Sequence, residues 1–226
     1  MKRVALVVVA LYFMVLALTA SAQVHVGIIG GLNFSDIKGE GTSEREISDH
    51  TVFGVGVLFD LGLMNHLSLC MEPMVIEKSA TGEEIDVNNP AIDLKLLFVE
   101  LPIFIKYSFG KIVKPYFIAG PTLGYLLSSE MSTEMGGITF NADTKSITEK
   151  LDVGIGFGGG VSFPVGLFSI FLEGRYTLGL RNINKGGDVV VKAGPIVIPA
   201  HIEETDRMKT RGLQVMAGIT FSLSGQ

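Results

Sequence analysis

The sequence contains no tryptophan and a single cysteine, Cys70, among its 226 residues. One cysteine excludes an intrachain disulfide framework and any metal site built from several cysteines. Lys and Arg number 18 against 23 Asp and Glu, a formal net charge of −5, so the chain lacks the basic surface that nucleic-acid binding needs. Charged residues make up only 18% of the chain, and the mean hydropathy is +0.44. The protein therefore needs an environment that tolerates a large apolar surface.

The patterns that usually carry catalysis or ligand chemistry are also missing. No serine lies in a G-x-S-x-G elbow, and the four histidines have no spacing typical of a metal site. The acidic stretch from Asp36 to Asp49 matches no calcium loop, so we expect a solvated loop there. Gly154, Gly156 and Gly159 satisfy G-x-G-x-x-G, but no helix pattern follows them, as a dinucleotide site requires. We expect no catalytic residue, no cofactor and no metal, and hence no enzyme.

The first 22 residues have the three parts of a secretory signal peptide. They are a basic start (Met1 to Arg3), an apolar run (Val4 to Leu18) and the small residues Ala20-Ser21-Ala22 of a cleavage site. The cleavage pattern disfavours the alternative, a retained membrane anchor. No later apolar run approaches the roughly 20 residues of a spanning helix. We therefore expect a signal peptide over 1–22 and a mature domain over 23–226 that crosses any membrane with strands.

Eight segments alternate between apolar residues and small or polar ones with a period of two, the pattern of strands with two different faces. They are Val24 to Ser35, Thr51 to Leu61, His66 to Lys78, Leu94 to Ser108, Pro115 to Ser128, Leu151 to Phe163, Phe168 to Arg181 and Arg211 to Leu223. Their connections alternate between long and short, as in outer-membrane barrels with short periplasmic turns and longer outer loops. The sequence thus predicts an all-β protein: an eight-stranded antiparallel up-and-down transmembrane β-barrel in the outer membrane of a Gram-negative bacterium, with short periplasmic turns and long extracellular loops.

Aromatic residues fall near the ends of these segments on the apolar face, as in the girdles of membrane barrels. Those at the expected periplasmic ends are Phe59, Tyr107, Phe117, Phe163, Phe168 and Phe221. The alternative is a secreted soluble barrel of lipocalin type, which points its apolar face inward and binds a small apolar ligand. The opposite face here is mostly Gly, Ser and Thr, without the dense charge of a soluble surface. This composition favours an apolar face directed at lipid.

Two features do not follow the simple strand pattern. Pro102 and Pro121 lie within segments, where each removes a donor from the ladder, so we expect a bulge at these points. The last loop is apolar from Asp188 to Ile202. It forms either a hairpin that turns near Ala193-Gly194-Pro195 and extends the wall, or a surface that binds a partner. The sequence leaves both interpretations open.

The polar face carries ionisable residues that would lie inside the barrel: Glu72, Glu100, Lys106, Lys150, Asp152, Glu173 and Arg175. An eight-stranded barrel is just wide enough for side chains to fill it, and buried charges must be paired. We therefore favour a structural network of ion pairs over a proton path or a narrow channel, with Glu72, Glu100, Lys106, Asp152, Glu173 and Arg175 as its members. Glu173 and Arg175 are two residues apart, so both would point inward and could meet Glu100 or Lys106.

Several stretches resemble the PorT-like outer-membrane β-barrel family. They are GGLNFS (Gly30 to Ser35), Glu100-Leu101-Pro102, Ala119-Gly120-Pro121, and Glu173-x-Arg175-Tyr176 followed by Gly179-Leu180-x-Asn182-Ile183. The resemblance covers nearly all of the mature chain and implies a small outer-membrane barrel that carries prolines at these places. It implies little about activity, although the founding member is associated with protein secretion across the outer membrane.

The expected role is therefore structural, adhesive or accessory to protein secretion. The expected partners are membrane lipid and, through the long loops, other outer-membrane or secretion-machinery proteins, but no nucleic acid.

Overall fold

The computed structural model describes residues 23–39, 51–82, 92–135, 137–193, 196–202 and 208–223. The expected signal peptide, residues 1–22, and most of the acidic first loop, residues 40–50, lie outside these ranges. In the described part of the chain, no helix is long and apolar enough to cross a membrane.

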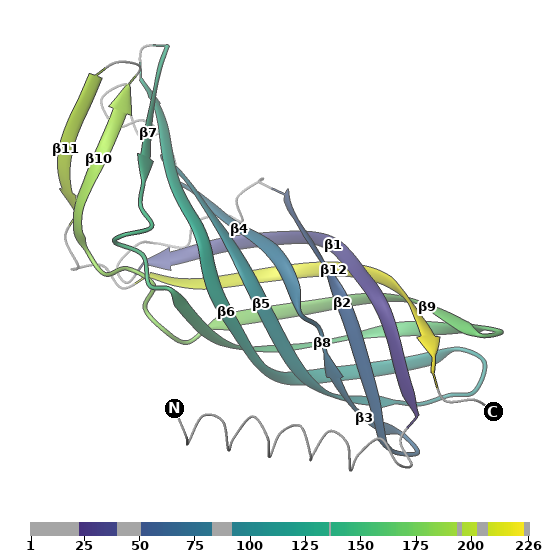
Figure 1. Cartoon of the computed structure of the whole chain (residues 1–226). Coiled ribbons are helices and arrows are strands. Elements are labelled where there is room, and N and C mark those ends of the chain that lie inside the picture. The colour runs from purple at the N-terminus through teal and green to yellow at the C-terminus, as the bar shows by residue number, and fades with distance from the viewer. Residues whose placement is uncertain are drawn as a thin grey trace.

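The regular structure consists of antiparallel strands that follow one another along the chain (Figure 1). The strands are β1 (Val24–Gly39), β2 (Thr51–Met64), β3 (Leu67–Met71), β4 (Met74–Gly82), β5 (Ile92–Ser108), β6 (Lys114–Met135), β7 (Ile138–Asp143), β8 (Leu151–Val165), β9 (Phe168–Gly179), β10 (Gly187–Ala193), β11 (Ile196–Ile202) and β12 (Met208–Ser222). Their order in the sheet is β11-β10-β7-β6-β8-β9-β12-β1-β2-β3-β5-β4, and β5 also pairs with β6. This extra pairing closes the sheet into a ring, so the predicted all-β, up-and-down antiparallel arrangement is confirmed.

The ring has eight positions, because β3 and β4 share one of them and β7, β10 and β11 lie outside it. The predicted third segment is thus two strands, separated at Glu72-Pro73. β2 pairs with β3 over Phe59 to Met64 and with β4 over Gly54 to Gly56. The break leaves the Pro73 carbonyl free to accept a hydrogen bond of 3.0 Å from the Val57 N–H of β2. Proline has no N–H for a ladder, so a break at this residue costs no backbone donor.

The two ends of the ring differ, as the alternating connections predict. Residues 65–66, 109–113 and 166–167 form short connections at one end, called here the turn end. The start of β1 and the finish of β12 meet there, with His25 opposite Ser222. At the other end, called the loop end, β6 continues past the ring and pairs with β7.

The apolar segment from Asp188 to Ile202 extends the sheet at the loop end. β10 and β11 form a hairpin in which Ala193 lies opposite Ile196, and β10 joins β7 through Val191 and Lys192. Of the two interpretations that the sequence leaves open, the structure thus contains the hairpin, although residues 194–195 themselves lie outside the described ranges. We call β7, the outer part of β6 and the β10–β11 hairpin the extension.

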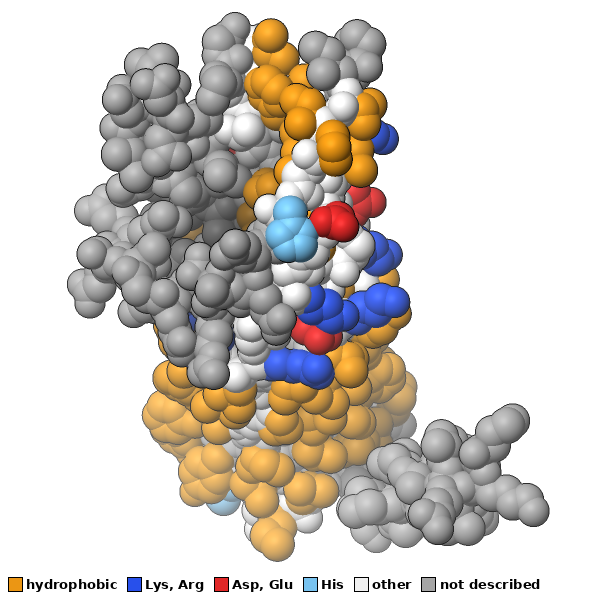
Figure 2. Space-filling model, turned by 90° about the vertical axis from the view of Figure 1, so that its left-hand side faces the viewer, with side chains coloured by type: hydrophobic (Ala, Val, Ile, Leu, Met, Phe, Trp, Pro, Cys, Tyr) orange, Lys and Arg blue, Asp and Glu red, His pale blue; other side chains and the backbone are white. Residues whose placement is uncertain are grey.

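The outer face of the ring forms an apolar belt, which Figure 2 shows as a broad band of hydrophobic side chains below the extension. Ile155, Leu172 and Val215 are 42%, 53% and 40% exposed, so the apolar residues point away from the ring interior. This orientation contradicts the lipocalin-type alternative, in which these residues would be buried. At the turn end, the rings of Tyr107, Phe109 and Phe117 follow one another with centroid separations of 6.4 and 6.0 Å.

The bulge expected at the two prolines is not present. Pairing of β5 with β6 skips Ile103 and Phe104 and resumes at Ile105 opposite Ala119 in the same register. A bulge occurs instead between Leu97 and Phe98. Gly120 of β6 allows the backbones of β5 and β6 to approach closely here, because a Cβ on this residue would overlap the carbonyl oxygen of Ile103. The ladder therefore accommodates the prolines by a close backbone approach rather than by an inserted residue.

Replacement of Gly120 by alanine should lower the free energy of unfolding by about 1–3 kcal/mol, because the backbone must move to relieve the overlap. The matched control is Gly174→Ala, since a Cβ there meets no heavy atom within 4 Å. That change should be neutral or slightly stabilising, because glycine is a poor strand residue. Urea titrations of the two variants refolded into lipid vesicles measure the difference. Equal stabilities would contradict the close approach.

Candidate functional site

The interior of the ring is packed with large side chains. Apolar residues contribute much of this core, and the buried cluster comprises Ile29, Leu58, Cys70, Met74, Ile76, Leu96, Phe98, Phe104, Tyr116, Ile118, Leu126, Phe171, Ile183 and Met216. The inner face is therefore more apolar than the strand pattern suggests. Ile29, which interrupts the alternation of the first segment, is one of these inward residues. Ion pairs lie among the apolar side chains at three levels along the ring.

The central level is built around Arg175 of β9. Its Nη1 contacts the Glu72 carboxylate and lies 3.3 Å from Glu173 Oε1, and its Nε donates a hydrogen bond of 2.6 Å to Gln214 Oε1. The hydroxyl of Tyr116 donates to Glu173 Oε2 at 3.1 Å. Arg175 is fully buried, so these contacts replace the water that its charge would otherwise need.

The second level lies toward the loop end and is centred on Lys78 of β4. Its Nζ is 3.1 Å from Glu100 Oε2 and 3.0 Å from Asp152 Oδ2. Thr210 of β12 donates a further hydrogen bond of 2.8 Å to Asp152 Oδ2. The ammonium also lies 5.0 Å from the ring centroid of Phe98, within range of a cation–π interaction.

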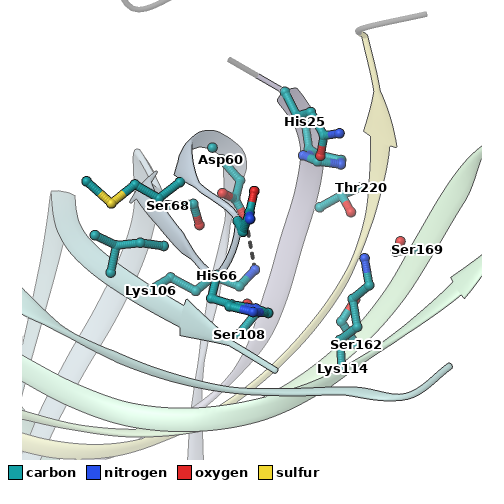
Figure 3. Close-up of a pocket in the computed structure, with 15 residues that line it drawn as sticks. His25, Asp60, His66, Ser68, Lys106, Ser108, Lys114, Ser162, Ser169 and Thr220 are labelled. Atoms are coloured by element: carbon teal, nitrogen blue, oxygen red, sulfur yellow. Dashed lines mark hydrogen bonds and ion pairs between the residues drawn. The ribbon is translucent and has the colours of Figure 1, made fainter. Parts of the chain in front are cut away.

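The third level lies at the turn end, where Lys106 Nζ is 2.8 Å from Asp60 Oδ2 and 4.4 Å from the ring centroid of Tyr116. This pair borders a small open pocket of about 140 Å³, shown in Figure 3. Its other polar residues are Gln23, His25, Asn65, His66, Ser68, Ser108, Lys114, Ser162, Ser169 and Thr220. The ion pair between Lys106 and Asp60 is part of the lining of this pocket.

All six residues predicted for the inner network are inside the ring, but they are divided among the three levels. Glu72, Glu173 and Arg175 meet at the centre, whereas Glu100 and Asp152 contact Lys78 and Lys106 contacts Asp60. Arg175 thus forms its ion pair with Glu72, which lies at the break between β3 and β4, and not with Glu100. The expectation that Lys150 lies on the inner face is wrong: this residue precedes β8, is exposed and lines a groove of the extension.

Sequence reasoning did not include Lys78 or Asp60 in the network, although Asp60 has the parity of the polar face of its segment. Lys78 has the same parity as Cys70 and Glu72, so alternation alone was enough to place it inside. The inward residues between them, Met74 and Ile76, are apolar and hide the pattern.

The described interior holds three cations, Lys78, Lys106 and Arg175, against five carboxylates, Asp60, Glu72, Glu100, Asp152 and Glu173. Each of the five lies within 4 Å of a cation, because Lys78 and Arg175 each serve two carboxylates. Among the described residues, no group of His, Cys, Asp or Glu is arranged to hold a metal ion. The geometry therefore places every one of these carboxylates beside a cation inside a packed core, with two more carboxylates than cations.

Comparison with known proteins agrees with this architecture. The family model described as outer membrane protein beta-barrel domain matches residues 19–185. A major outer membrane protein from Thermus thermophilus has a similar structure, with a TM-score of 0.55, 10% identity and coverage of 90% of this chain and 100% of that chain. OprG from Pseudomonas aeruginosa has a TM-score of 0.48 and 10% identity, and the match covers 90% of this chain and 96% of that chain. Neisserial surface protein A has a TM-score of 0.43 and 15% identity, and the match covers 90% of this chain and 99% of that chain. No curated protein sequence matches the chain.

Loss of Arg175 should be far more damaging than loss of an exposed arginine. In Arg175→Met, two buried carboxylates lose their cation, and removal of one partner from a buried pair typically costs about 3–5 kcal/mol. The control is Arg181→Met, which breaks an ion pair with Glu149. The Arg181 side chain is 46% exposed, so this change should lower the free energy of unfolding by only about 0–1 kcal/mol. Urea unfolding in vesicles measures both. If the double variant Arg175→Met with Glu72→Gln recovers no stability, the two residues are not coupled.

Proposed function

The chain belongs to the outer membrane protein beta-barrel domain family, and from this membership we propose a non-conducting, non-enzymatic protein that acts through its extension. It resides in the outer membrane of a Gram-negative bacterium, where the apolar belt contacts lipid. We infer that residues 1–22 serve as the signal peptide for export and that the loop end faces the outside of the cell.

The packed interior is the observation that supports a non-conducting role. An ion crossing the ring would have to displace paired charges at three levels and separate buried rings such as Phe98 and Phe104. Separation of buried ion pairs costs several kcal/mol per ion. The proposal therefore treats Glu72, Glu100, Lys106, Asp152, Glu173 and Arg175 as structural residues that fill the interior and pair its charges.

The extension is the surface that we propose makes contacts with other proteins. Val197 and Ile198 of β11 are 60% and 45% exposed, and exposed apolar groups of this kind favour association. β11 lies at the end of the described sheet, but Pro199 removes one of its backbone donors and so discourages addition of another strand. Contact through side chains is therefore favoured. The role would be structural, adhesive or, as the PorT-like resemblance suggests, accessory to protein secretion.

The sealed interior predicts that the purified protein gives no conductance steps in planar bilayers. Insertion is checked independently by heat-modifiable mobility on gels, which folded outer-membrane barrels show. A positive control of an open porin in the same bilayer establishes the sensitivity. Steps that appear with the wild-type protein and vanish in Arg175→Ala would show that ions pass through the central level, and the non-conducting proposal would be wrong.

The contact surface is tested by a photo-reactive amino acid at Val197 in intact cells. We expect adducts whose second protein, identified by mass spectrometry, is an outer-membrane or secretion-machinery component. The matched control places the same group at Ile112, which is 87% exposed in a short connection at the turn end. Equal adducts at both positions, or none at Val197, would contradict a contact role for the extension.

A further inference from the structure

Beside the ring, at the loop end, lies an open groove of about 1010 Å³ that none of the interior contacts uses. It is lined by β5, β6, β7, β10 and the segment before β8, and four lysines contribute to it: Lys95, Lys145, Lys150 and Lys192. All four are exposed. Within the described residues, no ion pair joins any of these lysines to a carboxylate, so their charges are available to a ligand.

The lower edge of the groove is continuous with the apolar belt. Lys95 lies on β5 opposite Glu130 of β6, and the Lys150 carbonyl accepts a hydrogen bond of 2.8 Å from the Leu126 N–H. The two lysines therefore flank β6, with Leu127 of the groove between them. The next pair down the wall is Tyr125 opposite Leu151, each 50% exposed.

Lys150 directly precedes Leu151 of the apolar belt, so this lysine lies at the edge of the belt. Figure 2 shows Lys and Arg side chains gathered just above the band of hydrophobic residues. The belt marks the hydrocarbon layer, so side chains directly above it lie at the depth of lipid headgroups. Aliphatic lysine stems pack well on apolar surface while their ammonium groups reach the polar layer.

The remaining lining suits a polar headgroup. Ser128, Ser132, Asn141 and Ser146 supply hydroxyl and amide groups. Three acidic residues also line the groove, against the four lysines: Glu130, Asp143, which accepts the backbone N–H of Lys145 at 2.9 Å, and Asp188, which lies 2.6 Å from His201. Glu130 lies opposite Lys95, and the count of four lysines against three carboxylates gives the lining one net positive charge. The side chains of the groove therefore keep an excess of positive charge.

We propose that this groove binds the phosphorylated headgroup of a lipid in the adjacent leaflet. Lys95 and Lys150 contact the phosphate, and an acyl chain descends over Leu127, Tyr125 and Leu151. Charge-assisted hydrogen bonds from ammonium groups to phosphate are among the stronger ones in proteins. The chain adds apolar contact that a free phosphate ion lacks. This site depends on membership of the outer-membrane family and is independent of whether the interior conducts.

The test titrates the mature protein in neutral detergent with dioleoyl phosphatidic acid, and native mass spectrometry counts the bound lipid. The comparison ligands are dioleoylglycerol, which has the same chains without phosphate, and inorganic phosphate. We expect phosphatidic acid to bind at least tenfold more tightly than either. In Lys95→Gln with Lys150→Gln, this affinity should fall at least tenfold, and arginine at both positions should preserve it.

The control of equal charge is Lys185→Gln with Lys209→Gln, because neither residue lines the groove. It should leave the affinity for phosphatidic acid unchanged, and heat-modifiable mobility checks that every variant is folded. Equal losses in the two double variants would mean non-specific attraction and overturn the proposal. Inorganic phosphate that binds as tightly as the lipid would indicate an ion site and would overturn it as well. Lipid binding that needs Mg²⁺ and persists without the two lysines would indicate bridging through the carboxylates, again contrary to the proposal.

Discussion

Closure of the hydrogen-bonded sheet is the constraint on which the rest of the structure depends. A bilayer offers no partner to an unpaired backbone group, so a sheet that crosses it cannot have free edges there. Here β1 pairs with β12 from His25 opposite Ser222 to Gly39 opposite Met208, and β5 pairs with β6 to complete the ring. Closure creates an inside that is too narrow for bulk water. Every charge that alternation directs inward must then find its counter-charge among the few side chains that reach it.

This constraint accounts for the composition of the interior. Two cations each serve two carboxylates, and aromatic rings cover them: the Arg175 guanidinium lies 5.5 Å from the Phe104 centroid, and Lys78 and Lys106 lie over Phe98 and Tyr116. Buried pairs rarely stabilise a fold more than apolar packing does. They do make the register strict, because Arg175 reaches Glu72 only if β9 and the break between β3 and β4 lie at the same level. We infer that the network contributes specificity of strand alignment more than free energy.

Much of this fold is predictable from alternation, because a hydrophobic pattern with a period of two indicates directly which residues of a strand share a face. It correctly assigns Leu172 and Val215 to the outside and Glu173 and Arg175 to the inside. It does not state which inward residues of different strands meet, since that depends on the stagger around the ring. Arg175 therefore pairs with Glu72 and Glu173, whereas contacts of Glu173 and Arg175 with Glu100 or Lys106 were expected. Lys78 was missed because Met74 and Ile76 are inward and apolar, and the bulge was expected at prolines that Gly120 accommodates.

The bulge between Leu97 and Phe98, which the sequence did not predict, also explains where the ring ends and the extension begins. Phe98 pairs with Leu126 but Leu97 pairs with Ser128, so Leu127 is an extra residue in β6. Leu126 and Ser129 are both buried, although residues three positions apart in a regular strand point to opposite faces. The bulge therefore reverses which side chains of β6 point outward beyond this point. Beyond it, Glu130 and Ser132 turn toward the groove, and Lys95 of β5 faces them across the pair. One inserted residue at the edge of the belt thus converts a wall that contacts hydrocarbon into a polar surface at headgroup depth.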